Sequence, residues 1–395
     1  EIMRVGIPAR GYADHFRDLY ETLGDRYAHF ESKGIDWEAV GEEMLLRGEQ
    51  LKSHEEFGLL CMELVARLED SHARVMNGSA ELPSIPFPAW DPGFSCLLDD
   101  RNQPVIYHVD PGSAAGNAGM QVGMTITRIN DEPVADVFAR NREQTKKYQG
   151  FSSDRYLDYQ TARFIGRQMN RNAMVDVSTV DVAGNEHSFS VRASMGVRYL
   201  PRLPVPRDEI TDSANVDWTK LDDETGYIYV RRIRDDLIEQ LDAAVADLQE
   251  CRGLVIDVRG NSGGGFDSKR SFRNFDPDDP EEAERPRFAG PIAVLIDSRC
   301  ISAGEGWASW FEANDRATFF GAATAGASAG KQTIDVLDGA FRVRFSVKAY
   351  RGFLERPIEP RGIEPDVPVK QTASDLAEGT DTVLNAARNH LSEQR

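Results

Sequence analysis

A glycine-rich segment follows a short apolar strand in the C-terminal half of the chain. RGNSGGG, residues 259–265, comes directly after the strand-like LVIDV. Consecutive glycines expose backbone N–H groups and adopt torsions that a β-carbon would forbid, so such a loop can hold a phosphate or an oxyanion. It lacks the GK[ST] ending of a Walker A loop and the GxGxxG spacing of a dinucleotide fingerprint. A merely flexible turn is the alternative.

A second strand end carries a serine. In IAVLIDSRCISAGEGWA, which begins at residue 292, Ser302 lies at the start of a predicted helix. Its hydroxyl would face free backbone N–H groups and the positive end of the helix dipole. Ser302 could simply cap the helix, because Glu305 completes a capping box. With a glycine-rich loop at a neighbouring strand end, a nucleophile beside an oxyanion hole is the better interpretation. Cys300, before the helix start, is the weaker candidate nucleophile.

A serine nucleophile needs a general base, and the chain has seven histidines. His72 differs from the rest because it ends a helical segment, in LEDSHARV, where the periodic pattern gives way to a loop. An ordinary surface histidine is the alternative at this position. The others have no distinctive neighbours in the sequence; they are His15, His29, His54, His108, His187 and His390.

Three regions of different pattern must position these residues. Residues 1–82 carry apolar side chains at three- and four-residue spacing, which predicts a helical domain. Residues 83–196 begin with a proline-rich stretch and continue with short strands and a helical stretch at 135–171. Residues 197–395 alternate strands with helices, which predicts a buried parallel α/β core. Gly253 is expected as a helix C-cap. The fold class is therefore multi-domain α/β.

Composition excludes several classes of protein. The chain has 395 residues, 46 Lys plus Arg and 65 Asp plus Glu, for a net charge of −19. An acidic protein repels phosphate backbones and anionic membranes, so a nucleic-acid partner is not expected. The apolar runs are too short to span a bilayer. The N-terminus as given has neither a signal-peptide nor a transit-peptide pattern. Four widely spaced cysteines are expected to be buried, and no metal-ligand spacing occurs.

Taken in order, these segments resemble the C-terminal processing (tail-specific) serine peptidases, and within them the tricorn core protease-like branch. The matching strings are YAHFESKGIDW, LEDSHARV, PGSAA…AGMQVGMTITRINDEPV, LVIDVRGNSGGG, IAVLIDSRCISAGE, a TAG turn at 324–326, an LDG hairpin at 337–339 and EPRGIEPDVPV at 359–369. The resemblance implies a crotonase- and ClpP-like α/β core at 197–395. It also implies a helical domain at 1–82 that supplies the base, and a PDZ-like β domain with a helical insertion at 83–196.

The resemblance also implies a catalytic set. One branch pairs the serine with a lysine that follows a TxGK turn, but here Ala327 occupies that position and Lys331 lies four residues further on. The tricorn-like branch uses a histidine and a glutamate, which correspond to His72 and Glu359. Glu355 and Glu364 are the alternative acids.

By the same resemblance, the oxyanion hole consists of the backbone N–H groups of Gly264 (or Gly263) and Ala303. Ser71, beside the base, would contribute a further hydrogen bond. In the PDZ-like part, the carboxylate-binding loop corresponds to WDPGF, where Asp91 would repel a C-terminal carboxylate. The PDZ-like domain could instead gate the site or bind an internal segment.

The implied function is a serine endopeptidase that cuts peptides or unfolded protein tails, without a metal or other cofactor. A homo-oligomer is compatible with the resemblance. Members of the family are mostly exported or envelope-associated in bacteria, so the periplasm, envelope or medium is slightly favoured over the cytoplasm. Two alternatives remain: a catalytically inactive peptide- or lipophile-binding relative, and a crotonase-like acyl-CoA enzyme.

Overall fold

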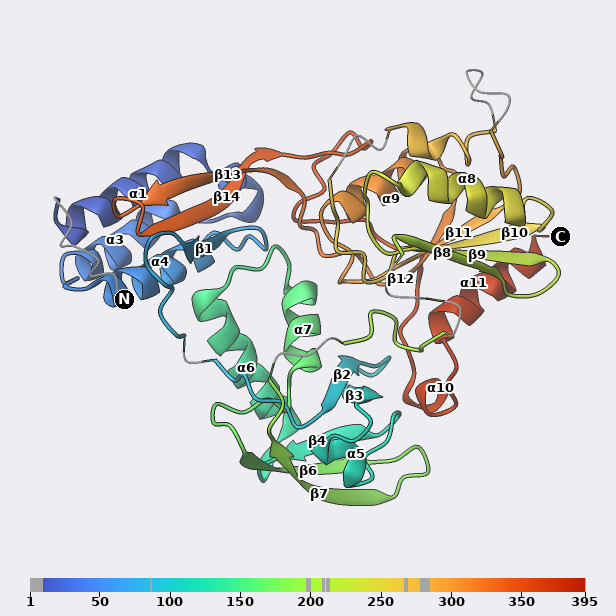
Figure 1. Ribbon diagram of the computed structural model, residues 1–395, viewed down its shortest axis with the longest axis horizontal. Coiled ribbons are helices and arrows are strands. Elements are labelled where there is room, and N and C mark those ends of the chain that lie inside the picture. The colour runs from blue at the N-terminus through green and yellow to red at the C-terminus, as the bar shows by residue number, and fades with distance from the viewer. Residues whose placement is uncertain are drawn as a thin grey trace.

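The computed structural model describes residues 10–394 except residues 86, 197–199, 208–209, 211–213, 266–268 and 278–284. The described chain forms three lobes that meet at a common centre (Figure 1). The N-terminal helices form one lobe, the strand-rich middle of the chain forms the second, and a six-stranded sheet with its helices forms the third. The predicted multi-domain α/β fold class is confirmed.

The first lobe begins with the helices that the apolar spacing predicts. They are α1 (Tyr12–Arg26), α2 (Phe30–Lys33), α3 (Trp37–Gly48) and α4 (His54–Ala66), followed by the strand β1 (Arg74–Asn77). Asp36 and Ser53 cap α3 and α4, each accepting a hydrogen bond from a backbone N–H in the first turn. The helices bury one continuous apolar cluster, which includes Phe16, Phe57 and Leu64.

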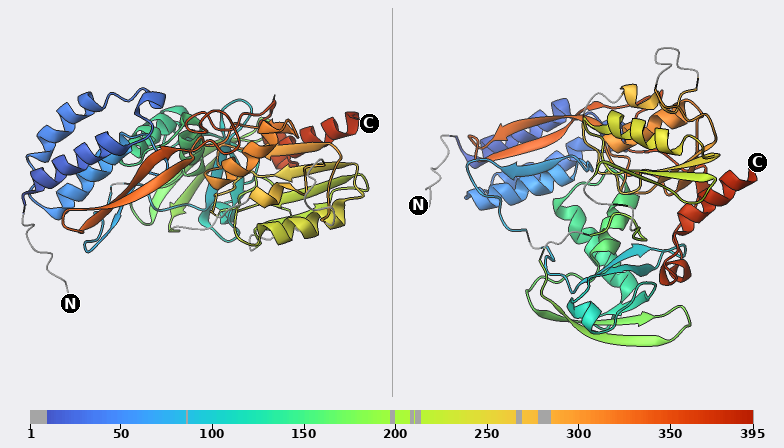
Figure 2. Two further views of the ribbon diagram at one scale, coloured as in Figure 1. Left: turned by 90° about the horizontal axis from the view of Figure 1, so that it is seen from above. Right: turned by 45° about the vertical axis from the view of Figure 1, so that its right-hand side comes forward.

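A hairpin from the far end of the sequence completes this lobe. Strands β13 (Ala329–Val336) and β14 (Phe341–Ala349) join β1 in a sheet of order β1-β14-β13. Phe341, Val343 and Phe345 of β14 enter the apolar cluster of the helices. Figure 2 shows the hairpin beneath the N-terminal helices when the molecule is seen from above. The N-terminal helices therefore bury their apolar face against a distant part of the chain.

The middle lobe contains a sheet of order β2-β3-β4-β6-β7 with β5 beside β4. Its elements are β2 (Phe94–Leu98), β3 (Pro104–Val109), α5 (Ala114–Asn117), β4 (Thr125–Ile129), β5 (Glu132–Pro133), α6 (Val134–Tyr148), α7 (Asp154–Arg163), β6 (Ala173–Val180) and β7 (Glu186–Ala193). The predicted helical stretch is present as α6 and α7, which rise from the sheet toward the centre of the molecule (Figure 1).

Asp91 does not carry an exposed negative charge in this lobe. Its side chain is buried, and its carboxylate accepts from the N–H of Gly93 at 2.8 Å and lies 3.3 Å from Nε of Arg167. The expected repulsion of a C-terminal carboxylate by Asp91 is therefore wrong, because a guanidinium offsets its charge.

The third lobe is a sheet of order β15-β12-β11-β10-β9-β8, parallel except for the β8–β9 pair. Its elements are β8 (Val216–Lys220), β9 (Thr225–Val230), α8 (Leu237–Leu248), β10 (Gly253–Asp257), the short 3-10 helix η1 (Lys269–Phe272), β11 (Ile292–Ile296), α9 (Ala303–Ala313), β12 (Thr318–Gly321), β15 (Val367–Pro368), α10 (Ala373–Ala377) and α11 (Thr382–Glu393). Helices α8 and α9 pack on one face and α11 on the other. Because β10 and β11 are parallel neighbours, the loops that follow them start at the same end of the sheet.

Gly253 is not the C-cap of the preceding helix. Helix α8 is capped by Gln249, and Gly253 is the first residue of β10. A Cβ at Gly253 would lie 3.3 Å from Leu391 of α11, so the glycine lets that helix approach the sheet. The C-cap prediction is wrong because packing, not the helix end, requires the small residue.

The four cysteines are unpaired and buried, as predicted. None of the helices in the described ranges has both the length and the apolar character needed to cross a bilayer.

Candidate active site

Ser302 lies in a sharp turn between β11 and α9. It directly precedes the first residue of α9, as predicted, with φ 61° and ψ −126°. A non-glycine residue in this region costs about 1–3 kcal/mol, and such residues concentrate at functional sites. The Ser302 N–H donates to the carbonyl of Ala327 at 2.9 Å, and Ser302 and Glu305 form the predicted capping box. The turn is held from both sides and presents a half-buried serine.

The glycine-rich loop lies directly against this turn. A Cβ at Gly263 would stand 2.8 Å from Cβ of Ser302 and 3.2 Å from the nitrogen of Ala303. A Cβ at Gly264, where φ is 155°, would stand 1.8 Å from the carbonyl oxygen of Ile233. Glycine is therefore required at both positions by close backbone approach.

The backbone N–H groups of this loop differ in their partners. The N–H of Gly263 donates to Oδ1 of Asn261 at 2.8 Å. Within the described ranges, neither the N–H of Gly264 nor that of Ala303 donates to another protein group. The structure thus brings the three predicted oxyanion-hole residues together and leaves two of their N–H groups available.

Glu305 ties the serine turn to the TAG turn. Its carboxylate is fully buried in the first turn of α9, and burial raises its pKa while several hydrogen bonds oppose that rise. The donors to its two oxygens are the N–H groups of Ser302 (3.2 Å), Gly326 (2.6 Å) and Ala327 (2.9 Å) and the hydroxyls of Thr324 (2.6 Å) and Ser328 (2.7 Å). The capping-box spacing indicated only the first of these contacts.

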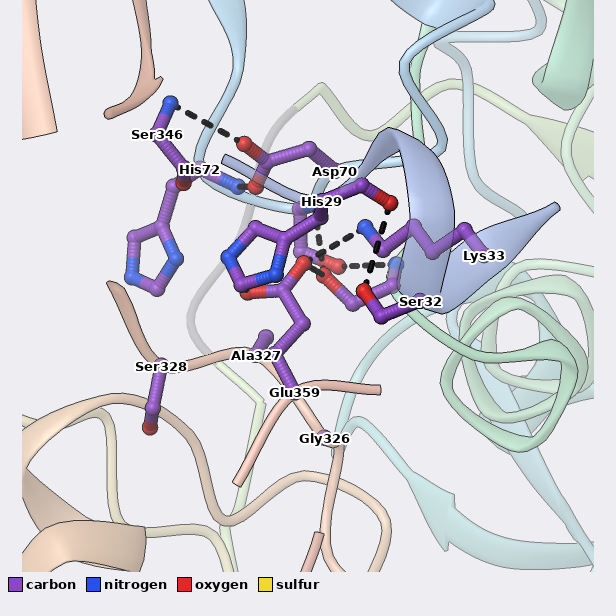
Figure 3. Close-up of polar contacts among 12 residues, drawn as sticks. His29, Ser32, Lys33, Asp70, His72, Gly326, Ala327, Ser328, Ser346 and Glu359 are labelled. Atoms are coloured by element: carbon purple, nitrogen blue, oxygen red, sulfur yellow. Dashed lines mark hydrogen bonds and ion pairs between the residues drawn. The ribbon is translucent and has the colours of Figure 1, made fainter. Parts of the chain in front are cut away.

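His72 lies in the loop between α4 and β1, and Asp70 holds that loop (Figure 3). Oδ1 of Asp70 accepts from the N–H of His72 at 2.7 Å, and Oδ2 accepts from the N–H of Ser346 on β14 at 3.2 Å. Burial and the nearby charge of Lys331 lower the pKa of His72. The resting imidazole is therefore neutral near pH 7, as a general base must be.

Glu359 lies close to His72 although 287 positions separate them in the sequence. One oxygen of Glu359, one ring nitrogen of His72 and one oxygen of Asp70 all lie within 4.8 Å of one another. Oε1 of Glu359 accepts from Nζ of Lys33 at 2.6 Å and from Oγ of Ser152 at 2.8 Å. Burial raises the pKa of Glu359 to about 7, with Asp70 adding to the rise and Lys33 opposing it.

A second histidine lies on the same carboxylate. His29 is 1% exposed, and its Nε2 stands 3.8 Å from Oε2 of Glu359 (Figure 3). The expectation that His29 has no distinctive neighbours is therefore wrong. Nε2 of His29, Nδ1 of His72 and Oε2 of Glu359 are all buried without a hydrogen-bond partner in the described structure. Glu359 thus has one oxygen held by donors and one free oxygen beside two imidazoles.

Ser71 connects the middle lobe to this cluster. Its N–H donates to Oγ of Ser152 at 3.0 Å, and its Oγ accepts from the N–H of Ser152 at 2.9 Å. Ser153 donates to the carbonyl of Ala325 at 2.6 Å, and Arg155 donates to carbonyls of the TAG turn and of the residues after Glu359. The segment between α6 and α7 and the first turn of α7 therefore contact the loop before His72, the TAG turn and the loop of Glu359. No sequence signal pointed to it.

The other candidates stand differently. Glu355 is exposed, and Glu364 is exposed and paired with Arg361. Cys300 is fully buried, and burial raises its pKa well above the usual range, which disfavours the thiolate. Within the described residues, no hydrogen bond joins Ser302 to His72 or to Lys331. The site is assembled except for the contact between serine and base.

Asp70, His72 and Glu359 also have donor atoms at a spacing that a metal ion could use. Their carboxylates are already occupied by other groups: both oxygens of Asp70 accept backbone N–H groups, and Lys33 pairs with Glu359. A cation would have to compete with an ammonium group for Glu359.

The fold and this arrangement define a multi-domain α/β protein with a candidate serine nucleophile beside a glycine-rich loop. Residues 224–369 match the model of peptidase family S41, and residues 8–66 match that of the tricorn protease C1 domain. The chain is a serine-type peptidase with an α/β region similar to family S41 and an N-terminal region similar to the tricorn C1 domain, so the resemblance to these peptidases is confirmed, while the PDZ-like part stays a prediction. No curated protein matches the chain at the sequence level.

Solved structures share the fold. Mature CPAF superposes with a TM-score of 0.64 at 13% identity, covering 96% of this chain and 95% of that one. A candidate peptidase from Parabacteroides merdae ATCC 43184 gives a TM-score of 0.55 at 17% identity, covering 97% of each chain. At these identities the likeness extends to the fold alone.

Proposed function

We propose that this chain is a serine endopeptidase that hydrolyses peptides or unfolded protein tails through Ser302, His72 and Glu359. The observation that carries the proposal is the proximity of His72 to a buried glutamate from the opposite end of the chain, with a ring nitrogen and a carboxylate oxygen within 4.8 Å of each other. Oε2 of Glu359 and Nδ1 of His72 both lack a hydrogen-bond partner, so a small approach would let them bond to each other. Such a bond fixes the tautomer that leaves Nε2 free to accept a proton.

The chemistry then follows the general course of acyl transfer. Oγ of Ser302 attacks the scissile carbonyl carbon, and its proton passes to Nε2 of His72. The tetrahedral intermediate places its negative oxygen on the free N–H groups of Gly264 and Ala303. Collapse of this intermediate expels the amine, which takes the proton from His72. In the second half of the reaction, His72 takes a proton from the water that attacks the acyl-enzyme and returns it to Oγ of Ser302 as the acid product leaves. Gly263 supports the loop, because its own N–H is bonded to Asn261.

Substrate binding must also close the gap between the serine and the base. His72 belongs to the first lobe and Ser302 to the third, and catalytic hydrogen bonds are often long or absent before substrate binds. A peptide strand laid between the lobes would contact both. Ser152, between α6 and α7, would hold Glu359 in place while the first and third lobes approach each other. A PDZ-like middle lobe would bring the substrate to the space between Ser302 and His72.

The direct test is labelling with a fluorophosphonate probe, followed by mapping of the modified peptide. We expect a single adduct on Ser302, none on the Ser302→Ala variant, and unchanged labelling of Cys300→Ala. An adduct elsewhere would contradict the assignment of the nucleophile. A folded protein that neither reacts nor cleaves a peptide library would favour the catalytically inactive binding relative.

Lys33→Met is expected to move the acidic limb of the pH–rate profile upward. Glu359 must be ionised to stabilise the imidazolium of His72, and Lys33 keeps its pKa from rising further. Without Lys33 the carboxyl group stays protonated to higher pH, so we expect the limb of kcat/KM to shift from near pH 7 by about one pH unit. Activity would then recover near pH 9.

Lys147→Met is the matched control, because Lys147 is exposed on α6 and pairs with Glu63 instead. If the acidic limb of the pH–kcat/KM profile lies at the same pH in the Lys33 and Lys147 variants, Lys33 does not influence the ionisation of Glu359.

A further inference from the structure

A row of basic side chains lies on one face of the sheet formed by β1, β14 and β13. Side chains alternate between the two faces of a strand. In β14, Phe341, Val343 and Phe345 enter the apolar cluster of the N-terminal helices, so Arg342 and Arg344 lie on the other face. The basic face consists of Arg74, Lys331, Arg342, Arg344 and Lys348; the three strands contain one acidic residue, Asp335.

This face is open. Figure 2 shows the N-terminal helices on one side of the hairpin only. Arg74, Arg342 and Lys348 are exposed, while Arg344 and Lys331 are half-buried. A ligand could therefore contact the exposed groups directly and, by covering the half-buried ones, exclude water from them.

The basic side chains of this face outnumber the acidic groups near them: Asp335 lies opposite Arg342 in the sheet register, and the charge of Asp70 acts on Lys331 and Arg344. Within the described residues, none of the five forms an ion pair, in a chain with 65 acidic residues and a net charge of −19. Arg74 and Arg344 are directly opposite one another in the sheet register. Like charges opposite each other destabilise a sheet pair. Burial and neighbouring positive charges lower the pKa of both Arg344 and Lys331. The arrangement costs stability, which points to a functional reason for it.

The basic face borders the base. Arg74 follows His72 by two residues, and the charges of Lys331, Arg344 and Arg74 all lower the pKa of His72. Lys331 also follows the turn that Glu305 binds, three residues after Ser328. A chain that passes between Ser302 and His72 therefore has this face beside it.

We propose that the basic face binds acidic side chains of the peptide substrate and makes the enzyme selective for acidic segments. This inference rests on the proposed function, because it assigns the substrate class of the same site. The positive groups span several register positions of a sheet, which fits an extended segment with acidic residues on alternate positions, about 6.6–6.8 Å apart, better than it fits a single terminal carboxylate. Charges at the rim of a site chiefly raise the association rate and are screened by salt.

The test compares matched peptides that carry either Glu or Gln at the same positions on each side of the scissile bond. At low ionic strength we expect kcat/KM for the Glu peptide to exceed that for the Gln peptide by about tenfold or more. The double variant Arg74→Gln/Arg344→Gln should lose most of this ratio, because only the Glu peptide loses charged partners, whereas any change in the pKa of His72 alters kcat/KM for both peptides alike. High salt should lower the ratio of the wild-type enzyme toward that of the variant.

Arg192→Gln is the matched control, because Arg192 is an exposed strand arginine on β7 in the middle lobe. It should keep the full Glu/Gln ratio. Arg344→Gln alone serves as a second variant if the double variant does not fold, and should show an intermediate ratio. Equal kcat/KM values for the two peptides in the wild type, or an unchanged ratio in the folded Arg344 variants, would overturn the inference.

Binding separates this inference from the proposed function. Ser302→Ala should bind the Glu peptide more tightly than the Gln peptide, measured by fluorescence anisotropy, and the preference should vanish when Arg74 and Arg344 are also replaced. If no peptide is cleaved but this preference is found, the proposed catalysis fails while the basic face stands. Peptides with amidated and free C-termini form the last comparison: a preference that follows the terminal carboxylate instead of the Glu residues overturns the assignment to acidic side chains.

Discussion

His72→Gln is expected to lower kcat/KM for any cleaved peptide by about 10⁴-fold or more, the scale of losing the base of a serine peptidase triad. Glutamine keeps a polar side chain of similar size but cannot take the proton of Ser302. The residual activity would come from the N–H groups of Gly264 and Ala303 and from substrate binding. Steady-state kinetics and the rate of fluorophosphonate labelling should fall together, because both depend on activation of the same hydroxyl.

His29→Gln is the decisive companion variant. His29 is buried against the same glutamate, with Nε2 3.8 Å from Oε2 of Glu359, yet Asp70 holds the loop of His72 and not the backbone of His29. We expect the His29 variant to lose less than about tenfold in kcat/KM, as for a residue that positions Glu359 without exchanging a proton. A His29 variant as inactive as the His72 variant, with normal folding, would mean that the base has been misassigned.

The parts of the site that lie within one strand–loop–helix unit could be predicted from sequence. Ser302 begins α9, and the glycine-rich loop leaves the neighbouring strand, because both follow from local signals: a short apolar strand, small residues and a helix start. Residues in the same unit stay near each other whatever the rest of the fold does. The placement of His72 and Glu359 as site residues came from family resemblance, since no local pattern joins them.

The contacts that support Glu359 could not be predicted, because they cross the whole chain. Lys33 is 326 positions away and Ser152 is 207 positions away. His29 has no distinctive neighbours in the sequence, and the residue whose carboxylate it lies beside, Glu359, is more than 300 positions away. The β13–β14 hairpin is a similar case: it belongs to the C-terminal region by sequence and completes the N-terminal core in space.

Glu305 makes more contacts than its sequence pattern predicts. The spacing from Ser302 indicated a helix cap, and that contact is present. The same carboxylate also accepts from the TAG turn and from Ser328, at distances of 2.6–2.9 Å. A capping residue needs only the local helix, whereas these donors arrive from residues about twenty positions further on.

Glu305→Ala is therefore expected to lower the free energy of unfolding by about 3–5 kcal/mol, the scale expected when several buried N–H and O–H donors lose a charged acceptor at once. Five donors would lose a shared acceptor together, and only the N–H of Ser302 and the hydroxyl of Ser328 have a second one; Ser302 would also lose a bond that holds its strained turn. Activity should be lost with the turn. The measurement is urea denaturation followed by tryptophan fluorescence, since Trp307 lies two residues beyond Glu305 in the core of α9.

Two further variants distinguish the effect of the buried Glu305 contacts from that of removing any glutamate from helix α9. Glu312→Ala removes a glutamate from the same helix, where it pairs with Arg356 near the surface, and should cost about 1 kcal/mol or less. Glu305→Gln keeps the shape but offers an NH₂ group to donors that need an acceptor, so it should fall between wild type and Glu305→Ala. If Glu305→Ala unfolds no more easily than Glu312→Ala, the Glu305 carboxylate does not stabilise the turns that it contacts, and the prediction is wrong. The strain at Ser302 would then have to be stabilised by other bonds to its backbone, such as those of the Ala327 carbonyl and the Ser328 hydroxyl.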